Sequence, residues 1–310
     1  MKADELYATI TQRIIDQLES SHLGTWTMPW QQIGRQPQSI DGREYRGINN
    51  LWLHMQQQPS AIWGTYKAWQ AHGCQVRKGA KATPVFLWKP SPPKADDPDA
   101  KSRLFATTFS VFAAEQCDGD EAQAACTPPV GLPDVQLIAE VSDMFERIGA
   151  DVRLGGDRAF YAPVDDYIAL PNPAQFSALD HYYSTMAHEH VHWTGHTTRL
   201  SRDLANRFGS EAYAAEELIA ELGAAMFCAT VGLPTIERPD HAQYISHWLS
   251  ILRGDHKAIV TAASQAQKAV DYLTLLAADV TDHIANCQCV ECNPDLHMET
   301  LRDQRLDIAS

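Results

Sequence analysis

The chain has 310 residues, of which 45% are hydrophobic and 21% charged, and eight are tryptophan, so wholly disordered chains are excluded. Its longest nearly apolar run, residues 222–233, is shorter than the roughly 18 residues that a membrane-spanning helix needs. The first residues do not resemble a signal peptide and the seven cysteines are unevenly spaced. We therefore expect a cytoplasmic protein with no membrane partner and no disulfide framework.

The net charge of −14 is divided very unevenly between the two parts of the chain. Residues 1–117 carry 13 basic and 10 acidic side chains, whereas residues 118–310 carry 12 basic and 29 acidic ones. Residues 35–90 are the most basic stretch, with eight basic against two acidic side chains, and six of the eight tryptophans lie in the first 90 residues. This division favours two domains that have different partners.

The N-terminal part begins with a predicted helix over residues 4–19, because Leu6, Ile10, Ile14 and Leu18 recur every four residues. Glycine and proline then divide residues 24–61 into short pieces. Strands are predicted at 81–89 and 104–112, separated by a proline-rich loop at 90–100. The segment 117–133 is rich in glycine, proline and small residues, which is typical of a linker.

The C-terminal part is predicted to be mostly helical. Helices are expected at about 134–148, 178–196, 213–230, 239–253 and 255–284, with a short hairpin of strands at about 159–170. We therefore predict an α+β protein of two domains. The first is a small α+β domain at 1–125 and the second a mostly helical domain at 134–285, with a linker at 126–133 and a cysteine-containing tail at 286–310.

The most specific motif is His188-Glu189-His190-Val191-His192, which has the pattern H-E-x-x-H. Residues 180–195 contain no proline and end at a glycine, as expected of a helix. His188 and His192 would then share one helix face and could both bind one Zn²⁺ ion. Glu189 would take a proton from the attacking water and pass it to the leaving amine. The alternative is a solvent-facing cluster on an ordinary helix.

A third metal ligand is expected on the acidic helix predicted at 213–230, where Glu217 lies 25 residues after His192. A glutamate on a second helix crossing the first would complete a His₂Glu site, and we favour Glu217. Glu221, one turn later, would orient a ligating imidazole by a hydrogen bond to its other nitrogen. Because spacing alone does not choose among them, Glu216 and Glu221 stay open as ligands, and so does an acidic, solvated helix face.

Aromatic and basic residues alternate in residues 43–50 and 63–81, a mixture that suits single-stranded nucleic acid. Bases can stack on aromatic rings while basic side chains contact the phosphates. The competing interpretation is that tryptophans at such spacings, including Trp52, Trp63 and Trp69, belong to the core. The candidate DNA-binding residues are Arg46, Tyr66, Lys67, Arg77, Lys78 and Lys81.

The tail holds a second candidate metal site. Cys287, Cys289 and Cys292, with His283 or His297 as a fourth ligand, have a spacing that suits a structural zinc ion in a reducing compartment. The alternative is a set of unpaired thiols.

Taken together, the motifs resemble those of the ArdC-type antirestriction proteins of conjugative plasmids, over nearly the whole chain. The matching N-terminal motifs are Tyr45-Arg46-Gly47-Ile48-Asn49, Trp63-x-Thr65-Tyr66-Lys67-x-Trp69 and Val76-Arg77-Lys78-Gly79-x-Lys81. The matching C-terminal motifs are His188-Glu189-x-x-His192-x-Thr194-Gly195-His196, Arg199-Leu200 and Glu216-Glu217-Leu218-x-Ala220-Glu221-Leu222-Gly223.

This resemblance implies that the first domain binds single-stranded DNA and that the second is a zincin-like metallopeptidase domain. It also implies protection of incoming plasmid DNA from host restriction during conjugation, in the bacterial cytoplasm or after transfer to the recipient cell. Zn²⁺ is the expected metal, and Mn²⁺ could occupy the same site. The alternative function is a DNA-targeted zinc metalloprotease that cleaves a DNA-bound host protein.

Overall fold

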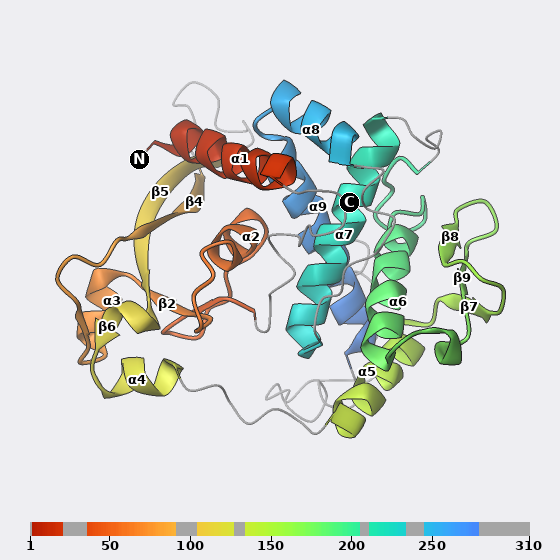
Figure 1. The fold of residues 1–310 in the computed structure, drawn as a ribbon, viewed down its shortest axis with the longest axis horizontal. Coiled ribbons are helices and arrows are strands. Elements are labelled where there is room, and N and C mark those ends of the chain that lie inside the picture. The colour runs from red at the N-terminus through yellow and green to blue at the C-terminus, as the bar shows by residue number, and fades with distance from the viewer. Residues whose placement is uncertain are drawn as a thin grey trace, which may run out of the picture.

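The structure, a computed structural model, describes residues 2–20, 36–90, 104–126, 134–204, 211–233 and 245–278. An N-terminal half of helices and strands lies beside a mostly helical C-terminal half (Figure 1). The α+β fold class predicted from the sequence is therefore confirmed. Among the described residues, no helix is both long enough and apolar enough to cross a bilayer.

The N-terminal half is built on a mixed sheet of strand order β1-β2-β5-β4. Its strands are β1 (Gln38–Ser39), β2 (Ile62–Gly64), β4 (Thr83–Pro90) and β5 (Leu104–Ala113), and its helices are α1 (Ala3–Ser20), α2 (Ile48–His54) and α3 (Tyr66–Ala71). The two predicted strands are confirmed as β4 and β5, which form a long antiparallel ribbon with Thr83 opposite Val111 and Phe86 opposite Thr108. Helices α2 and α3 are too short for a periodic pattern to reveal them.

The expected linker at 117–133 begins instead with regular structure, so this part of the prediction is wrong. After a 3₁₀ turn (Ala114–Gln116), β6 (Cys117–Asp118) pairs with β3 (Gln75–Val76), and α4 (Asp120–Cys126) follows. The reason is burial, because Cys117 and Ala122 pack with Trp69 in a small second core. Residues 127–133 of the expected linker lie outside the described residues.

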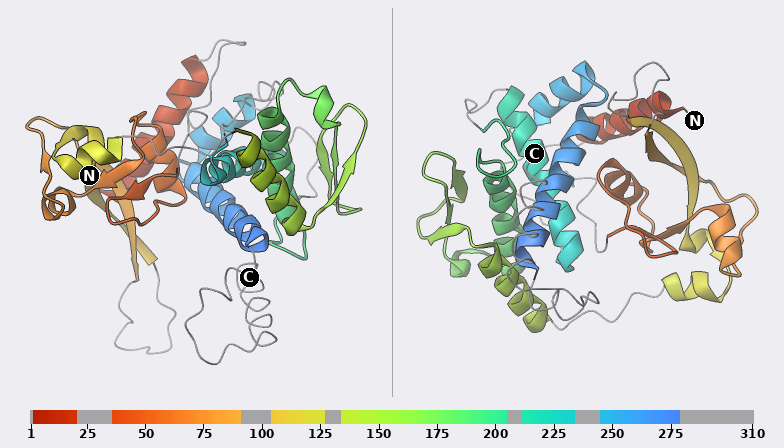
Figure 2. Two further views of the ribbon diagram at one scale, coloured as in Figure 1. Left: turned by 90° about the horizontal axis from the view of Figure 1, so that it is seen from below. Right: turned by 180° about the vertical axis from the view of Figure 1, so that it is seen from behind.

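Helix α1 presents its predicted apolar stripe to the rest of the protein. Leu6, Ile10 and Ile14 are fully buried, and α1 packs against both β5 and α8 (Ile245–Gly254). The hydroxyl of Thr11 donates a hydrogen bond of 2.8 Å to the backbone oxygen of His256. Helix α2 lies against α9 (Ala258–Ala277), and the two halves can be seen side by side in Figure 2. One continuous cluster of buried hydrophobic side chains runs through both halves.

The C-terminal half has three helices side by side, α6 (Leu179–Thr194), α7 (Glu211–Val231) and α9, with α5 (Asp134–Ile148) against α6 and α9. A three-stranded sheet of order β7-β9-β8 lies beside α6, formed by β7 (Asp151–Leu154), β8 (Phe160–Ala162) and β9 (Tyr167–Leu170), with a 3₁₀ turn (Pro173–Gln175) after it. The predicted hairpin is confirmed as the antiparallel pair β8–β9. Strand β7, which pairs parallel with β9, was not predicted.

Each of the five predicted helices corresponds to an observed helix, from α5 to α9. The start of the fourth, residues 239–244, and the end of the fifth, residues 279–284, lie outside the described residues. The five helices could be predicted because α5 and α8 are amphipathic and α6, α7 and α9 are runs of 16 to 21 residues without proline.

Close packing between α6 and α7 depends on Gly223. A Cβ atom at this position would lie 2.8 and 2.9 Å from the two methyl carbons of Val191 on α6. We expect Gly223→Ala to destabilise the protein by about 1–3 kcal/mol, because the added methyl group forces the helices apart. Urea unfolding followed by circular dichroism measures this effect. Gly254→Ala is the control, since a Cβ there meets no atom within 4 Å, and equal unfolding midpoints for both variants would contradict the prediction.

Candidate metal centre

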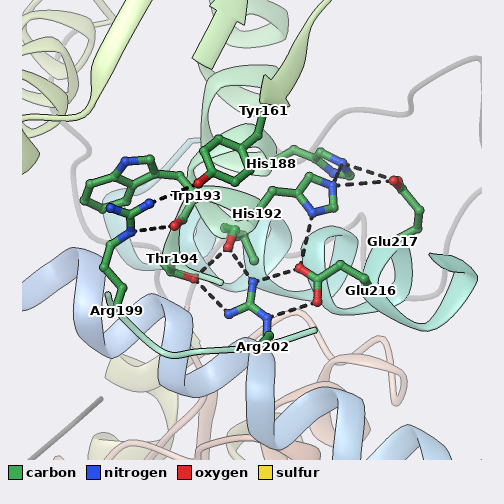
Figure 3. Close-up of polar contacts among 10 residues, drawn as sticks. Tyr161, His188, His192, Trp193, Thr194, Arg199, Arg202, Glu216 and Glu217 are labelled. Atoms are coloured by element: carbon green, nitrogen blue, oxygen red, sulfur yellow. Dashed lines mark hydrogen bonds and ion pairs between the residues drawn. The ribbon is translucent and has the colours of Figure 1, made fainter. Parts of the chain in front are cut away.

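Three predicted metal-binding residues come together where α6 and α7 cross. His188 and His192 lie one turn apart on α6, and both imidazoles face Glu217 on α7 (Figure 3). Nε2 of His188 and Nε2 of His192 each lie 3.5 Å from a carboxylate oxygen of Glu217, and the two Nε2 atoms are 3.1 Å apart. Within the part of the chain that the structure describes, this is the one cluster with metal-ligand geometry.

The other nitrogen of each imidazole contacts a different glutamate of α7. Nδ1 of His188 lies 2.9 Å from Oε1 of Glu221, and Nδ1 of His192 lies 3.2 Å from Oε1 of Glu216. Because a carboxylate only accepts hydrogen bonds, these two contacts favour the tautomer that has its proton on Nδ1 and a lone pair on Nε2. The three glutamates that spacing could not distinguish thus take different places, and Glu217 is the one that contacts both Nε2 atoms.

These residues fit a divalent cation. Two imidazole lone pairs and a carboxylate converge on one largely buried point, where electron-rich atoms repel one another unless a cation lies between them. Ligands at 2.0–2.1 Å from a tetrahedral Zn²⁺ ion would be about 3.3 Å apart, close to the separations of 3.1 and 3.5 Å in the structure.

Glu216 and Glu217 are held in the ionised form despite their burial. Burial by itself would raise the pKa of Glu217, but the contacts with His188 and His192 lower it to about 2. Burial also opposes ionisation of Glu216, and hydrogen bonds from His192 and Arg202 hold its pKa below the ordinary value. The site therefore presents negative charge toward a cation.

Glu189, the expected proton carrier, follows His188 on α6 and is only 2% exposed. His190, between the two candidate ligands, belongs to the core instead. Its ring lies 4.6 Å from that of Phe145, its Nδ1 contacts the backbone oxygen of Met186 at 2.8 Å, and burial lowers its pKa to about 4.

Two buried arginines near the site, Arg199 and Arg202, were not singled out as site residues, although the first lies in a family motif. Arg199 donates a hydrogen bond to the backbone oxygen of Trp193, stacks on the ring of that tryptophan and pairs with Asp166, and Arg202 pairs with Glu216. No local pattern in the sequence marks these two arginines, because their neighbours in residues 196–204 are mostly polar.

Five of the six candidate DNA-binding residues lie in one region of the N-terminal half. Tyr66 and Lys67 are exposed at the start of α3, and the Tyr66 hydroxyl accepts a 2.9 Å hydrogen bond from Gln75 of β3. Exposed Arg77, Lys78 and Lys81 follow β3 in the turn toward β4, where Gly79 has a φ of 88°.

The remaining candidate, Arg46, lies elsewhere and pairs with Asp271 of α9 at the contact between the halves. Arg77 is also engaged, because its guanidinium contacts Asp118 and the backbone oxygens of Glu115 and Cys117. The three lysines are therefore the cations of this set that form no ion pair with another of the described residues.

The ribbon β4–β5 exposes large side chains that the sequence analysis did not single out. Leu87, Trp88 and Phe105 are 41%, 38% and 48% exposed, and Lys89 pairs across the ribbon with Phe105. By contrast, the structure places Trp52, Trp63 and Trp69 in the core, as the competing interpretation held. The tail site at Cys287, Cys289 and Cys292 lies outside the described residues.

Each half of the chain matches a known protein family, and two relatives match nearly the whole chain. A family model described as the N-terminal domain of anti-restriction factor ArdC matches residues 4–112, and one described as a zincin-like metallopeptidase matches residues 139–265. An uncharacterized protein, y4eC of Sinorhizobium fredii, is 38% identical over 89% of this chain and 93% of its own length. The DNA primase TraC of Escherichia coli is 34% identical over 95% of this chain, which spans only 29% of TraC.

Two solved structures also match. The metal-free structure of the antirestriction protein ArdC from plasmid R388 has a TM-score of 0.74 and 36% sequence identity, and the match covers 88% of this chain and 97% of that one. Its Mn(II)-bound structure matches with a TM-score of 0.71, also at 36% identity, over 89% of this chain and 99% of that one.

Proposed function

Because the chain belongs to the ArdC family of antirestriction proteins, we propose that it binds single-stranded DNA and protects incoming plasmid DNA from host restriction during conjugation. The N-terminal half would coat the strand and limit nuclease access, in the bacterial cytoplasm or after transfer to the recipient cell. The C-terminal half would supply a metal-dependent peptidase.

The observation that supports DNA binding is the set of exposed lysines and aromatic rings on the N-terminal half. Lys67, Lys78 and Lys81 would contact phosphates, and Tyr66 lies among them as a ring on which a base can stack. Trp88 and Phe105 offer two further exposed rings along the ribbon that starts next to Lys81.

Replacing Lys67, Lys78 and Lys81 together by alanine should weaken binding to a single-stranded oligonucleotide and flatten its salt dependence. Removing one lysine–phosphate interaction reduces the slope of log K against log salt by about 0.7, so the slope of the triple variant should fall by about 2. Fluorescence anisotropy across a salt series measures both the affinity and the slope. We leave Arg77 unchanged because its contacts stabilise the turn itself.

Lys268→Ala is the control, since Lys268 is an exposed lysine on α9 in the other half of the protein. An unchanged slope in the triple variant would place the DNA on another surface. Trp88→Ala with Phe105→Ala tests the ribbon separately, and a loss of about 1–3 kcal/mol per base would support stacking there.

The candidate metal centre supports a second activity, peptide hydrolysis. His188, His192 and Glu217 would hold a divalent cation, Zn²⁺ or Mn²⁺, with Glu216 and Glu221 orienting the imidazoles. When bound, such a cation supplies Lewis acidity at the scissile carbonyl group. The carboxylate of Glu189 would accept the proton of the attacking water and deliver it to the leaving nitrogen atom. A host protein bound near the DNA is the substrate class that this arrangement would serve.

A further inference from the structure

The loop that follows α6 contains two buried arginines with separate sets of partners. The side chains of Arg199 and Arg202 are 8% and 7% exposed. They are three residues apart in the chain, yet Arg202 contacts the surroundings of His192 while Arg199 contacts the β8–β9 turn (Figure 3). The effect of removing Arg202 on the metal centre can therefore be compared with the effect of removing Arg199.

Arg202 joins three segments through well-formed hydrogen bonds. Its Nε and Nη2 donate to the two carboxylate oxygens of Glu216, at 3.0 and 2.8 Å. Nη1 donates to the hydroxyl oxygen of Thr194 at 2.9 Å, and Nη2 also donates to the backbone oxygen of Val191 at 2.6 Å. Arg202 thus fastens Glu216 of α7 to the last turn of α6, where His192 lies.

We infer that Arg202 is a positioning residue, which sets the orientation of the His192 imidazole by holding Glu216 against Nδ1 of that histidine. The inference rests on the proposed metal centre. Without Arg202, the Glu216 carboxylate would lose the two hydrogen bonds that Arg202 donates to it and would keep only its contact with His192. The 3.2 Å contact between Glu216 and Nδ1 of His192 would then no longer be fixed. The imidazole could rotate, so that its Nε2 atom no longer points toward the proposed metal position between His188 and Glu217.

A fork-shaped guanidinium is required for this task. It contacts both oxygens of the carboxylate in one plane, whereas an ammonium group at the same place provides the charge without the paired geometry. Since Glu216 is buried, its negative charge also needs a partner close by. Arg202 meets both requirements. The need to neutralise the buried charge would not by itself explain why the guanidinium contacts both oxygens of the Glu216 carboxylate.

Arg199 provides the matched control. Its guanidinium is equally buried and pairs with Asp166, donates to the Tyr161 hydroxyl at 3.2 Å and stacks on Trp193 at 3.9 Å. None of these partners is one of the three candidate ligands or one of the glutamates at their Nδ1 atoms. Loss of Arg199 therefore removes a buried guanidinium from the same loop without changing the contact between Glu216 and His192.

The test is the affinity of the full chain for Mn²⁺, followed by the electron paramagnetic resonance signal of free and bound Mn²⁺. We expect Arg202→Gln to weaken binding by about 10- to 100-fold, the range seen when partners of metal-binding residues are removed. Arg202→Lys should also weaken it, because the charge remains and the fork is lost. Arg199→Gln should stay within about twofold of the wild type.

A wild-type affinity for Arg202→Gln would overturn the inference, and so would an equal loss in Arg199→Gln, which would show a general effect of the loop. If Arg202→Gln does not fold, Arg202→Lys with Glu216→Gln decides the matter in a double-mutant cycle, where independent, additive losses would also overturn it. Failure of the wild type to bind Mn²⁺ or Zn²⁺ would refute the proposed metal centre itself. That result is distinguishable from those that refute only the role of Arg202, because in those the wild type binds the metal.

Discussion

Glu217→Gln is expected to weaken the binding of Zn²⁺ and Mn²⁺ by more than about 100-fold, because removal of a mere partner of a ligand already costs about 10- to 100-fold. The amide keeps the shape of the side chain but removes the one carboxylate that faces both Nε2 atoms. Two neutral imidazoles would remain, a poorer site for a divalent cation than two imidazoles and an anion.

Isothermal titration of the metal-free chain measures this loss. Glu140→Gln is the matched control, since Glu140 is exposed on α5 and undergoes the same chemical change. Circular dichroism establishes that both variants are folded. Retention of wild-type affinity by Glu217→Gln would show that the metal binds elsewhere, and Glu216→Gln and Glu221→Gln would then be compared in the same way.

Glu189→Gln is expected to keep its metal and to lose peptidase turnover by about 10²- to 10⁴-fold, the usual contribution of a proton-transferring side chain. The amide cannot accept the proton of the attacking water. Hydrolysis of fluorescently labelled casein by the metal-loaded chain, with a chelator-treated sample as the blank, measures the loss. Turnover equal to that of the wild type would remove Glu189 from the reaction.

The same variant separates the two functions that the sequence analysis left open for this chain. If DNA coating is the protective step, Glu189→Gln should still bind single-stranded DNA and shield it from a restriction nuclease in conjugation assays. If protection requires cleavage of a DNA-bound host protein, it should disappear together with peptidase turnover. Unchanged DNA binding in the variant is the condition that makes either result interpretable.

The continuous core between the two halves changes the picture of two domains on a linker. Helix α1 packs on α8, and the backbone nitrogen of Gly47 donates a 2.9 Å hydrogen bond to Gln267 of α9. Composition could reveal two regions with different charge, because charge is a local property of the sequence. Composition could not reveal that the apolar stripe of α1, in the N-terminal half, is covered partly by α8 of the C-terminal half.

Features that depend on short-range periodicity could be predicted from the sequence. Helix α6 and the shared face of His188 and His192 follow from the 3.6-residue repeat, and the apolar stripe of α1 from the same rule. The strands β4 and β5 were likewise predicted, since each is long and bounded by turn residues, whereas their antiparallel pairing was not.

Contacts between distant segments of the chain determine which glutamate faces the two Nε2 atoms and which basic residues are engaged elsewhere. Glu216, Glu217 and Glu221 are separated by how α7 crosses α6, which is set by close packing of Gly223 on Val191. Arg46 pairs with Asp271, a residue 225 positions away, so no local pattern could have predicted its partner. The physical reason is common to both cases. Periodicity fixes the direction of a side chain relative to its own helix, whereas its partner depends on packing between segments far apart in the chain.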